Sequence, residues 1–562
     1  MRWAFAFVCL LTCSSLVYGQ CETGWVTTIG GVPTGSQASV GFAMCVDENG
    51  FVYAVSSEYR SDSLLVGGNW IQGAGNGNIQ NRDFYVVKYS PSGTVIWTMY
   101  FGGKNQDYPK DAALDSEGNL YITGQFRDTL DFNGQNAIIS TGTQDIFLCK
   151  ISSEGIFQWV CKYGNSVARG ISVDVDANGV YMAGVFFTDS IVVGDSIFYC
   201  APPSGQSDVV VMKHDLNGNL GWSRHLTGQN SQQVGALSVN NGKVVLAGVY
   251  LEEFIATEQT LSGNSSYNYY LLSMNSTDGA IEWIQQSDGG GLSAIVENIV
   301  FDDEGNIYLS GRFNTNTISF QNIQTQNNGQ YDYFILRTSS SGVPEWITSS
   351  DGSGFEVAYG IAISGNNLLV IGGFSQSSFN VGDDILVNPG DEDIFLATYN
   401  LSNGEGICAE SYHGDGVEIG LTLSSLDDTV YVQGLFTNDV ILDGMTISPL
   451  GNQDLFIWKT CVPCNSLTVS GKTLTERSIK LRVSPNPTTT HTQISYRTPQ
   501  GTRPMLHLTD MLGRTVQTVQ LAGHEGTYTL DASALGTGVY FCSLVNGAEV
   551  LATQKLSVIR NE

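Results

Sequence analysis

The chain has 562 residues, too many for one simple hydrophobic core, and only 14% of them are charged. Its formal net charge is −29, because 54 Asp and Glu stand against 25 Lys and Arg. Such a surface excludes nucleic acid as a partner, since binding a phosphate backbone requires clustered cations. The 65 Gly, with 25 Tyr and 25 Phe, fit a turn-rich β protein.

Residues 1–19 are typical of a secretory signal, with Arg2 as the basic start and Trp3–Leu11 as the apolar stretch. We expect cleavage after Gly19. Cys21 favours a lipoprotein, but Gln20 stands where a small residue is required, so lipidation is the minor alternative. No other apolar run reaches the length of a membrane span, and we expect no transmembrane segment.

The segment Asp115–Gly124 returns through the chain at intervals of about 60 residues and marks an internal repeat. Related copies start at Asp47, Asp176 and Asp302, with weaker copies near Asn241, Gly365 and Leu426. A second pattern travels with the first and consists, in its first copy, of Asp83, Lys88, Gly93 and Trp97. The period predicts seven units.

Each unit is predicted to contain four antiparallel strands. In one unit these are Ala112–Leu114, Leu120–Phe126, Asp145–Ile151 and Ile156–Tyr163. The Asp-x-x-Gly-Asn and Ser/Gly segments between them suit tight hairpin turns, and β-forming residues alternate within the strands. Four such strands in about 60 residues are typical of a propeller blade. The predicted fold class is therefore all-β, with a seven-bladed beta-propeller over residues 20–461.

The two ends of the predicted propeller complete each other. Trp25 and Gly30 repeat the spacing of Trp97 and Gly102, so the first strand is a fourth strand without its own first three. The last unit, Ile419–Cys461, has three strands. We expect the N-terminal strand to complete this blade and close the ring, which removes exposed strand edges.

The connections between strands two and three are long and variable, and all should lie on one face. They are Ser56–Arg82, Arg127–Gln144, Thr188–Ser207, Glu252–Tyr267, Asn314–Tyr331, Ser375–Glu392 and Asn438–Gln453. Internal patterns such as Leu130–Gly134 indicate a small extra hairpin on each blade. Variable loops on a rigid scaffold are a common binding surface, and the longest loop places Tyr59 and Trp70 on the candidate binding face. That these loops only cap the blades is an equally strong reading.

Nine cysteines remain after the signal, so at least one is unpaired. In the repeat register, Cys21 and Cys461 occupy the two ends of the turn that joins strands three and four in complete units. The ends of such a turn lie within about 7 Å, near disulfide range. We expect a Cys21–Cys461 disulfide in this exported protein, with Cys464 as the rival partner and unrelated thiols as the alternative.

Residues 462–480 are polar, carry no blade pattern and are predicted to be a linker. From Leu481 to the end of the chain, a shorter pattern of seven β segments indicates a small C-terminal β-sandwich. Its motifs include Pro485, Asn486 and Pro487, then Asp510, Gly513 and Arg514, then Gly538 and Tyr540, and finally Lys555.

In their order and spacing these motifs resemble the type A sorting domain of the Bacteroidetes type IX secretion system. The resemblance implies that residues 481–562 direct the protein across the outer membrane through that machinery. The domain would then be removed and the protein released, or attached to surface lipopolysaccharide. The repeats themselves resemble the beta-propeller repeats of exported bacterial proteins, a scaffold that does not fix function. We expect a secreted or outer-surface location.

No catalytic motif stands out. Asp174–Gly179 matches the first half of a calcium loop, but Val185 stands where the Glu ligand belongs, and the segment aligns with the hairpin turns. We assign it as a turn and predict no metal or cofactor, with calcium at the acidic turns left open. The six His lack zinc spacing. The repeated Lys and Trp follow every unit and are assigned to packing.

We therefore expect a non-enzymatic binding or adhesion module that uses its loop-rich face on glycans or proteins. One alternative is an extracellular polysaccharide lyase or hydrolase, with carboxylates and Tyr at the mouth of the channel. The other is a structural component of the cell surface. Asp, Tyr and Arg converging in the channel would favour the enzyme, whereas exposed aromatics on the loop face would favour glycan binding.

Overall fold

The computed structural model describes residues 24–31, 39–59, 63–72, 82–103, 105–132, 134, 136–187, 190–200, 206–256, 259–263, 265–388, 390–463, 480–484, 486–498, 504–510, 514–546 and 549–560. The chain forms two compact units, Met1–Cys464 and Asn465–Glu562. Both are all-β in their described residues. In that part of the chain, no helix is long and apolar enough to cross a membrane.

Seven antiparallel sheets in the described part of unit 1 have four or six strands, and each contains one set of four that we call a blade, numbered 1 to 7. Within a blade, the strands follow one another from the inner edge to the outer edge. Blade 1 is β2 (Ser39–Val46), β3 (Val52–Tyr59), β6 (Arg82–Tyr89) and β7 (Val95–Gly103). Blade 2 is β8 (Tyr108–Leu114), β9 (Leu120–Phe126), β12 (Asp145–Ile151) and β13 (Phe157–Tyr163). Blade 3 is β14 (Val167–Asp176), β15 (Gly179–Phe187), β18 (Ser207–His214) and β19 (Leu220–Leu226).

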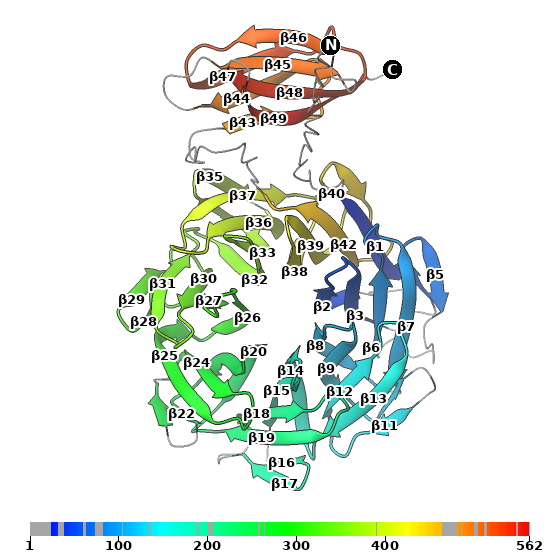
Figure 1. Cartoon of the computed structure of the whole chain (residues 1–562), viewed down its shortest axis with the longest axis vertical. Helices are drawn as coiled ribbons and strands as arrows, with labels where there is room; N and C mark the ends of the chain where they lie inside the picture. The colour runs from blue at the N-terminus through cyan, green and yellow to red at the C-terminus, as the bar shows by residue number, and fades with distance from the viewer. Residues whose placement is uncertain are drawn as a thin grey trace, which may run out of the picture. The chain divides into compact units, whose positions relative to one another are not determined.

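Blade 4 is β20 (Gln232–Asn240), β21 (Lys243–Tyr250), β24 (Tyr267–Asn275) and β25 (Ile281–Gly291). Blade 5 is β26 (Ile295–Phe301), β27 (Ile307–Phe313), β30 (Asp332–Thr338) and β31 (Pro344–Ser349). Blade 6 is β32 (Phe355–Ser364), β33 (Asn367–Ser375), β36 (Asp393–Asn400) and β37 (Gly406–Tyr412). Blade 7 is β38 (Glu418–Leu426), β39 (Thr429–Phe436), β42 (Asp454–Cys461) and β1 (Trp25–Gly31). Figure 1 shows these sheets around a common axis, with their first strands innermost.

The N-terminal strand joins the last blade, as the repeat predicts. β1 pairs antiparallel with β42, in a register that sets Trp25 opposite Lys459 and Ile29 opposite Leu455. β42 in turn pairs with β39. Blade 7 therefore combines the first and last strands of unit 1, and β42 has a neighbour on both sides.

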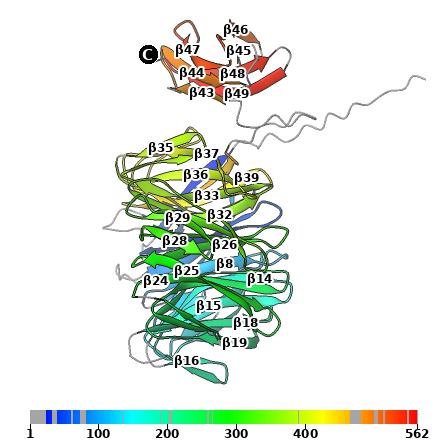
Figure 2. The ribbon, with the colours of Figure 1, turned by 90° about the vertical axis from the view of Figure 1, so that its left-hand side faces the viewer.

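A short hairpin separates strands two and three of every blade, again as predicted. The hairpins are β4–β5 (Ser63–Val66, Asn69–Gln72), β10–β11 (Thr129–Phe132, Ala137–Ile139), β16–β17 (Ser190–Val193, Ser196–Tyr199), β22–β23 (Glu253–Ala256, Gln259–Ser262), β28–β29 (Thr317–Phe320, Ile323–Gln326), β34–β35 (Ser377–Val381, Asp384–Asn388) and β40–β41 (Val440–Leu442, Met445–Ile447). They lie at the outer rim of the ring in Figure 1, and Figure 2 shows β16 at the edge of unit 1 from the side as well.

Several hairpins bond to the outer strand of the preceding blade. β4 pairs with β1, β10 with β7, and β28 with β25. Single bridges join Gly164 to Val192, Thr227 to Ile255, and Gly414 to Val440 in the same manner. The hairpins therefore link neighbouring blades as well as covering the rim.

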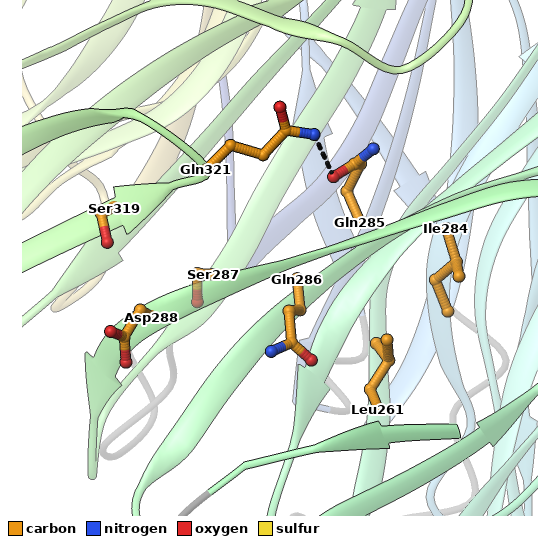
Figure 3. Close-up of a pocket in the computed structure, with 8 residues that line it drawn as sticks. All are labelled: Leu261, Ile284, Gln285, Gln286, Ser287, Asp288, Ser319 and Gln321. Carbon is orange, nitrogen blue, oxygen red and sulfur yellow. Dashed lines mark hydrogen bonds between the residues drawn. The ribbon is translucent and has the colours of Figure 1, made fainter. Parts of the chain in front are cut away.

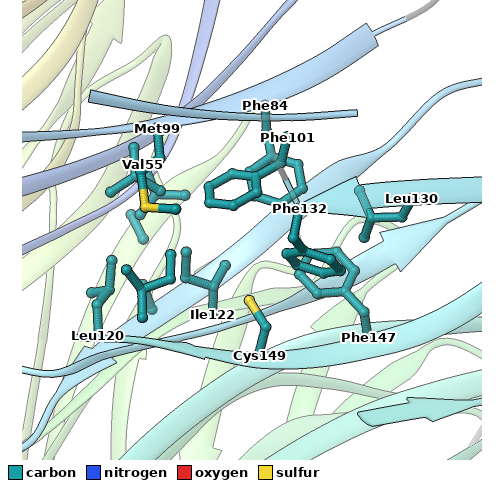
Figure 4. Packing of buried hydrophobic residues seen from close by; sticks show 14 of the residues in the cluster. Val55, Phe84, Met99, Phe101, Leu120, Ile122, Leu130, Phe132, Phe147 and Cys149 are labelled. Atoms are coloured by element: carbon teal, nitrogen blue, oxygen red, sulfur yellow. The ribbon is translucent and has the colours of Figure 1, made fainter. Parts of the chain in front are cut away.

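Each pair of neighbouring blades encloses a hydrophobic layer. Between blades 1 and 2, Phe84 stacks on Phe147 with ring centroids 5.4 Å apart, and Phe101 packs on both Phe84 and Phe132 (Figure 4). Phe132 belongs to a hairpin, so the rim contributes to this core. Burial of such large side chains is the main stabilising force between blades.

The repeated Trp and Lys also act between blades. Trp97 Nε1 donates a hydrogen bond to the carbonyl oxygen of Ser153 in the next blade at 3.1 Å, and Lys88 Nζ donates to the same oxygen at 2.9 Å. Lys88 Nζ also lies 4.7 Å from the centre of the Tyr53 ring. Equivalent Trp bonds start from Trp25, Trp159, Trp222 and Trp346. These contacts agree with the assignment of the repeated residues to packing.

Unit 2 contains two antiparallel sheets. One consists of β43 (Lys480–Ser484), β44 (His491–Arg497) and β47 (Glu525–Asp531), and the other of β46 (Thr515–Gln520), β45 (Met505–Asp510), β48 (Gly538–Asn546) and β49 (Glu549–Val558). Their inward side chains share one core, to which Ile494 and Tyr496 come from the first sheet and Leu508 and Leu544 from the second.

Candidate functional site

Of the two residues predicted for the binding face, Trp70 is the one whose side chain the structure describes. Trp70 lies on β5 opposite Leu65, and 57% of it is exposed. Tyr59 is the last residue of β3, and its side chain lies outside the described residues. A second exposed aromatic, Tyr199 on β17, is 68% exposed and was not singled out from the sequence.

Other large apolar side chains also point to solvent from the hairpins. They are Ile139, Val192, Ile197, Ile385, Val387 and Ile441. Apolar side chains scattered singly on a surface are ordinary, and these six recur on the hairpins of four blades. The hairpins therefore combine a structural role, at their contact with the preceding blade, with an exposed apolar side.

A β-bulge interrupts each inner strand at the same position of the repeat. One residue per blade is left unpaired with the second strand: Phe42, Lys110, Ile171, Gly235, Glu297, Tyr359 and Leu421. All seven are half-buried. Bulges redirect side chains and are common beside functional sites. The inner wall of the ring therefore carries a set of residues that differ from blade to blade.

Two of these bulge residues belong to a polar cluster between blades 5 and 6, which we call the axial cluster: Glu297, Arg312, Tyr359 and Glu392. Glu297 Oε1 lies 3.7 Å from Arg312 Nε, and the Tyr359 hydroxyl donates to Glu392 Oε1 at 3.4 Å. Arg312 comes near the end of β27, just before a hairpin, and Glu392 immediately precedes β36, just after the next hairpin. The axial cluster therefore lies at the end of the blades from which the hairpins leave.

Burial dominates the electrostatics of the axial cluster. It raises the pKa of Glu297 to about 7, although the positive charge of Arg312 opposes the change. Burial also raises the pKa of Glu392, against the hydrogen bond from Tyr359 and the charge of Arg312. A carboxyl group with a pKa near 7 can exchange a proton at neutral pH, so this arrangement can bind polar ligands or act in proton transfer.

The opposite side of the inner wall is basic. Lys110 Nζ lies 5.4 Å from the centre of the Phe42 ring, and burial and the nearby Arg169 lower the pKa of Lys110. Arg169 Nε donates to Gln144 Oε1 at 3.3 Å, and its guanidinium lies 5.0 Å from the Phe187 ring. Lys110 thus contacts a ring of blade 1 from blade 2, and Arg169 contacts an amide of blade 2 from blade 3, so both cations already have protein contacts across a blade boundary.

The calcium-like segment serves as a turn and as a link between blades. Asp176 Oδ1 accepts from the backbone N–H of Asn178, and the Asp174 carboxylate accepts from Ser238 and from the backbone N–H of Val239 in the next blade. No group of His, Cys, Asp and Glu within the described ranges could hold a metal ion.

Two histidines, His225 and His413, each contact the repeated aspartate near the start of the third strand of their own blade. His225 Nε2 lies 2.7 Å from Asp208 Oδ2, and His413 Nδ1 lies 2.6 Å from Asp393 Oδ2. The hydrogen bond that His413 donates to the Asp393 carboxylate raises the pKa of His413, although burial opposes the change. The two aspartates hold equivalent positions in the repeat, whereas the two histidines do not.

A shallow groove of about 340 Å³ crosses the outer strand of blade 4 between two hairpins, and Figure 3 shows the residues around it. Gln321 Nε2 donates to Gln285 Oε1 at 2.8 Å, and Tyr250 donates to Gln286 Oε1 at 3.1 Å. Because these amides already have protein partners, the groove offers less unused hydrogen-bonding capacity than the axial cluster.

Cys461 is disulfide-bonded, and so is Cys408, which the repeat register did not single out. The predicted partner Cys21 and the rival Cys464 lie outside the described residues. The pairing therefore stays a prediction.

The described sorting-motif residues form hydrogen bonds at the turns and strand ends of unit 2. Asn486 Nδ2 donates to the Lys555 carbonyl oxygen at 2.7 Å, and Arg514 Nε donates to Asp510 Oδ2 at 2.7 Å. The Tyr540 hydroxyl donates to the carbonyl oxygen of Gly536 at 3.0 Å. Gly538 begins β48, while Pro485 and Gly513 lie outside the described part of the chain.

Sequence reasoning missed the axial cluster, although the repeat contains a signal for it. The residue after the repeated glycine of strand two is Gln125, Val185, Val249, Arg312, Gly373 and Leu435 in blades 2 to 7. A charged residue occurs there in blade 5 alone among these. In blade 6 this residue is Gly373. A Cβ at Gly373 would lie 2.3 Å from Glu392 Oε1, so the glycine leaves room for the Glu392 carboxyl group.

Two protein-family models match the chain. The first, described as a secretion system C-terminal sorting domain, matches residues 482–559. This segment is a type IX sorting domain. The second, described as a beta-propeller repeat, matches residues 96–125, which cover β7 to β9. The chain is thus a beta-propeller repeat protein that the type IX secretion machinery handles and sends to the outer surface or the medium.

The similar proteins are distant. An uncharacterized WD repeat-containing protein of Acanthamoeba polyphaga mimivirus is 20% identical over 56% of this chain, and the regulatory protein FlaEY of Caulobacter vibrioides is 24% identical over 57%. The chain spans 28% of the length of each. The quinohemoprotein alcohol dehydrogenase from Comamonas testosteroni is similar over 80% of this chain and 78% of its own, with 10% identity and a TM-score of 0.38.

Proposed function

We propose that the exported chain is a closed seven-bladed propeller with a C-terminal sorting sandwich. We propose further that it binds glycans at the cell surface through the exposed side of its rim hairpins, which we call the hairpin-bearing face. One observation carries the binding function: Trp70 and Tyr199 expose their rings on rim hairpins, together with other apolar hairpin side chains. An aromatic ring offers a rigid apolar face with a polar edge, which suits the mixed apolar and hydroxyl surface of a sugar.

Charge argues against acidic partners and leaves neutral glycans among the candidates. A net charge of −29 disfavours acidic polymers and acidic membrane surfaces. Rigid blades hold the hairpins in fixed positions, so the exposed rings can bind without a large loss of conformational entropy.

The polysaccharide-cleaving alternative also has a specific observation in its favour. Glu297, Arg312, Tyr359 and Glu392 come together on the inner wall, and the pKa of Glu297 is near 7. Cleavage requires an acid and a base on either side of the reacting bond, and it produces new reducing ends.

The test is a glycan array, followed by polysaccharide pull-down with the mature chain. Trp70→Ala and Tyr199→Ala should each weaken binding of the retained glycan by roughly tenfold, because ring contacts are worth about 1 kcal/mol or more. The control variants are Ile156→Ala and Val343→Ala, which remove comparably exposed apolar side chains near the turns between strands three and four.

If the control variants lose as much binding as the ring variants, the hairpin-bearing face is not the binding surface. Bound polysaccharides are also assayed for new reducing ends, which would establish the enzyme instead. Retention of none of the glycans by the wild-type chain would reject glycan binding.

A further inference from the structure

The axial cluster combines hydrogen-bonding groups that the protein itself does not use. Arg312 Nε and Glu297 Oε1 are buried and have no hydrogen-bond partner, and among the described residues no hydrogen bond is found to the terminal guanidinium nitrogens or to Glu297 Oε2. Glu392 accepts one bond, from Tyr359, through Oε1. Partly buried donors and acceptors without partners cost free energy when they also lose water.

These free groups can be reached from solvent. The Arg312 side chain is 27% exposed and the Glu297 side chain 16% exposed, while Arg312 Nε and Glu297 Oε1, which face each other, are covered. The two covered atoms form an ion pair at 3.7 Å without a hydrogen bond, and the exposed remainder presents donors beside acceptors.

Alternating donors and acceptors match the chemistry of hydroxyl groups. A hydroxyl donates one hydrogen bond and accepts up to two, so neighbouring hydroxyls can donate to Glu297 or Glu392 and accept from Arg312. Hydrogen bonds to charged partners are stronger than those between neutral groups. A sugar ring carries such hydroxyls side by side.

The charge of the axial cluster selects against acidic sugars. Two carboxylates stand against one guanidinium, so the ionised cluster has an excess of one negative charge within a chain of net charge −29. A uronate or sulfate would approach a surface of its own sign.

We propose that the axial cluster, formed by Glu297, Arg312, Tyr359 and Glu392, binds adjacent hydroxyl groups of a neutral saccharide. This inference rests on the proposed glycan-binding function. It adds a specificity-determining site between blades 5 and 6, at the end of these blades from which the hairpins leave. Glu297 and Arg312 are the principal contacts, and Tyr359 positions Glu392.

The experiment measures binding of the full mature chain to three neutral probes, dextran, laminarin and mannan, and to two acidic probes, alginate and hyaluronan. The variants are Glu297→Gln, Arg312→Gln and Arg312→Lys. The matched control is Glu304→Gln, which changes an exposed carboxylate on the turn at the opposite end of blade 5. Thermal melting of each variant monitors the fold.

We expect at least one neutral probe to bind, and Glu297→Gln and Arg312→Gln to weaken that binding tenfold or more. Arg312→Lys should restore part of it, and Glu304→Gln should leave it unchanged. If the axial variants bind a neutral probe as tightly as the wild-type chain, this inference is wrong while the glycan-binding function stands. Binding of acidic probes alone also overturns it, and binding of no probe overturns it together with the glycan-binding function.

If the variants do not fold, the pH dependence of saccharide binding by the wild-type chain tests the proposal. A hydroxyl can donate to Glu297 when the carboxyl group is ionised, so affinity for the neutral probe should rise between pH 5.5 and pH 8.5. Tyr359 stays protonated over this range because burial raises its pKa. Glu392 changes in the same direction as Glu297, so a flat profile would contradict the proposal.

Discussion

Trp159 joins two blades with one side chain. Its Nε1 donates to the carbonyl oxygen of Leu216 at 3.2 Å, and its ring packs against Gly218, where a Cβ would lie 2.9 Å from the ring. Gly218 has a φ of +87°, a conformation that glycine adopts without strain. The Trp therefore requires the Gly of the next blade, which explains why both recur with the same period.

Trp159→Ala should lower the free energy of unfolding by roughly 3 kcal/mol, because it removes an aromatic packing contact and an inter-blade hydrogen bond. Urea unfolding followed by tyrosine and tryptophan fluorescence measures the change. Trp70→Ala is the matched control, since the Trp70 ring is exposed and its removal should cost less than about 0.5 kcal/mol. Equal losses in the two variants would contradict the packing role.

A buried acid pair joins blades 5 and 6. Burial raises the pKa of Asp332 to about 8, with a further contribution from Glu356, whose own pKa burial also raises. The two carboxyl groups are neighbours, and two buried carboxyl groups side by side favour protonation of one of them. Both folded pKa values thus exceed the values in an unfolded chain, which are near 4.

The acid pair makes stability depend on pH. Between about pH 4 and pH 8 the folded protein binds more protons than the unfolded chain, so the free energy of unfolding should fall as pH rises. Asp332→Asn cannot ionise, yet its amide can still accept from the Asn328 N–H and donate to Glu356. Between pH 5 and pH 8, we expect the free energy of unfolding of Asp332→Asn to fall by roughly 2 kcal/mol less than that of the wild type, as measured by urea unfolding. Parallel declines would show that the pair does not titrate as described.

At the scale of strands, periodicity predicted the blades because turns and alternation are local properties. Leu120–Phe126 and Asp145–Ile151 have the predicted bounds as β9 and β12. The inner strand of the same blade starts earlier than predicted, at Tyr108 instead of Ala112. The bulge at Lys110 explains the difference, since one unpaired residue shifts the alternation that the sequence pattern depends on.

The axial cluster could not be predicted from local pattern, because its members come from four separate strands or strand ends of two blades. Glu297 and Arg312 are brought together by the pairing of β26 with β27, while Glu392 reaches the cluster over Gly373. The signal available in the sequence is a departure from the repeat. Arg312 and Glu297 are charged where most equivalent blades carry apolar or small residues, and structural repeats do not require such a change.

The cysteines predict how the N-terminal strand β1 is attached to blade 7. Nine cysteines follow the signal, and Cys45, Cys149, Cys161, Cys200 and Cys542 form no disulfide. Cys461 and Cys408 are disulfide-bonded, and Cys21 and Cys464 complete the count. We predict that peptide mapping of the unreduced protein by mass spectrometry finds Cys21 linked to Cys461, and so Cys408 linked to Cys464. A peptide linking Cys461 to Cys464 would reject the repeat-register argument.

At the scale of the whole molecule, the two ends of the chain differ in what they contribute to stability. β1 supplies the outer strand of blade 7 and pairs with β42 over five residue pairs, from Trp25–Lys459 to Ile29–Leu455. Its removal would expose the edge of β42 and part of the core in which Ile29 is buried. Unit 2 instead has its own core, formed within residues 481–558.

Two truncations of the mature chain test this difference. Deletion of residues 20–31 should lower the melting temperature of the propeller or cause aggregation, because an unpaired strand edge and an opened core promote association. Deletion of residues 481–562 should leave that melting temperature unchanged, because blades stabilise one another through neighbour contacts that this deletion leaves in place. Differential scanning calorimetry of both proteins makes the comparison. The opposite ranking would mean that the sorting domain, rather than the closing strand, stabilises the ring.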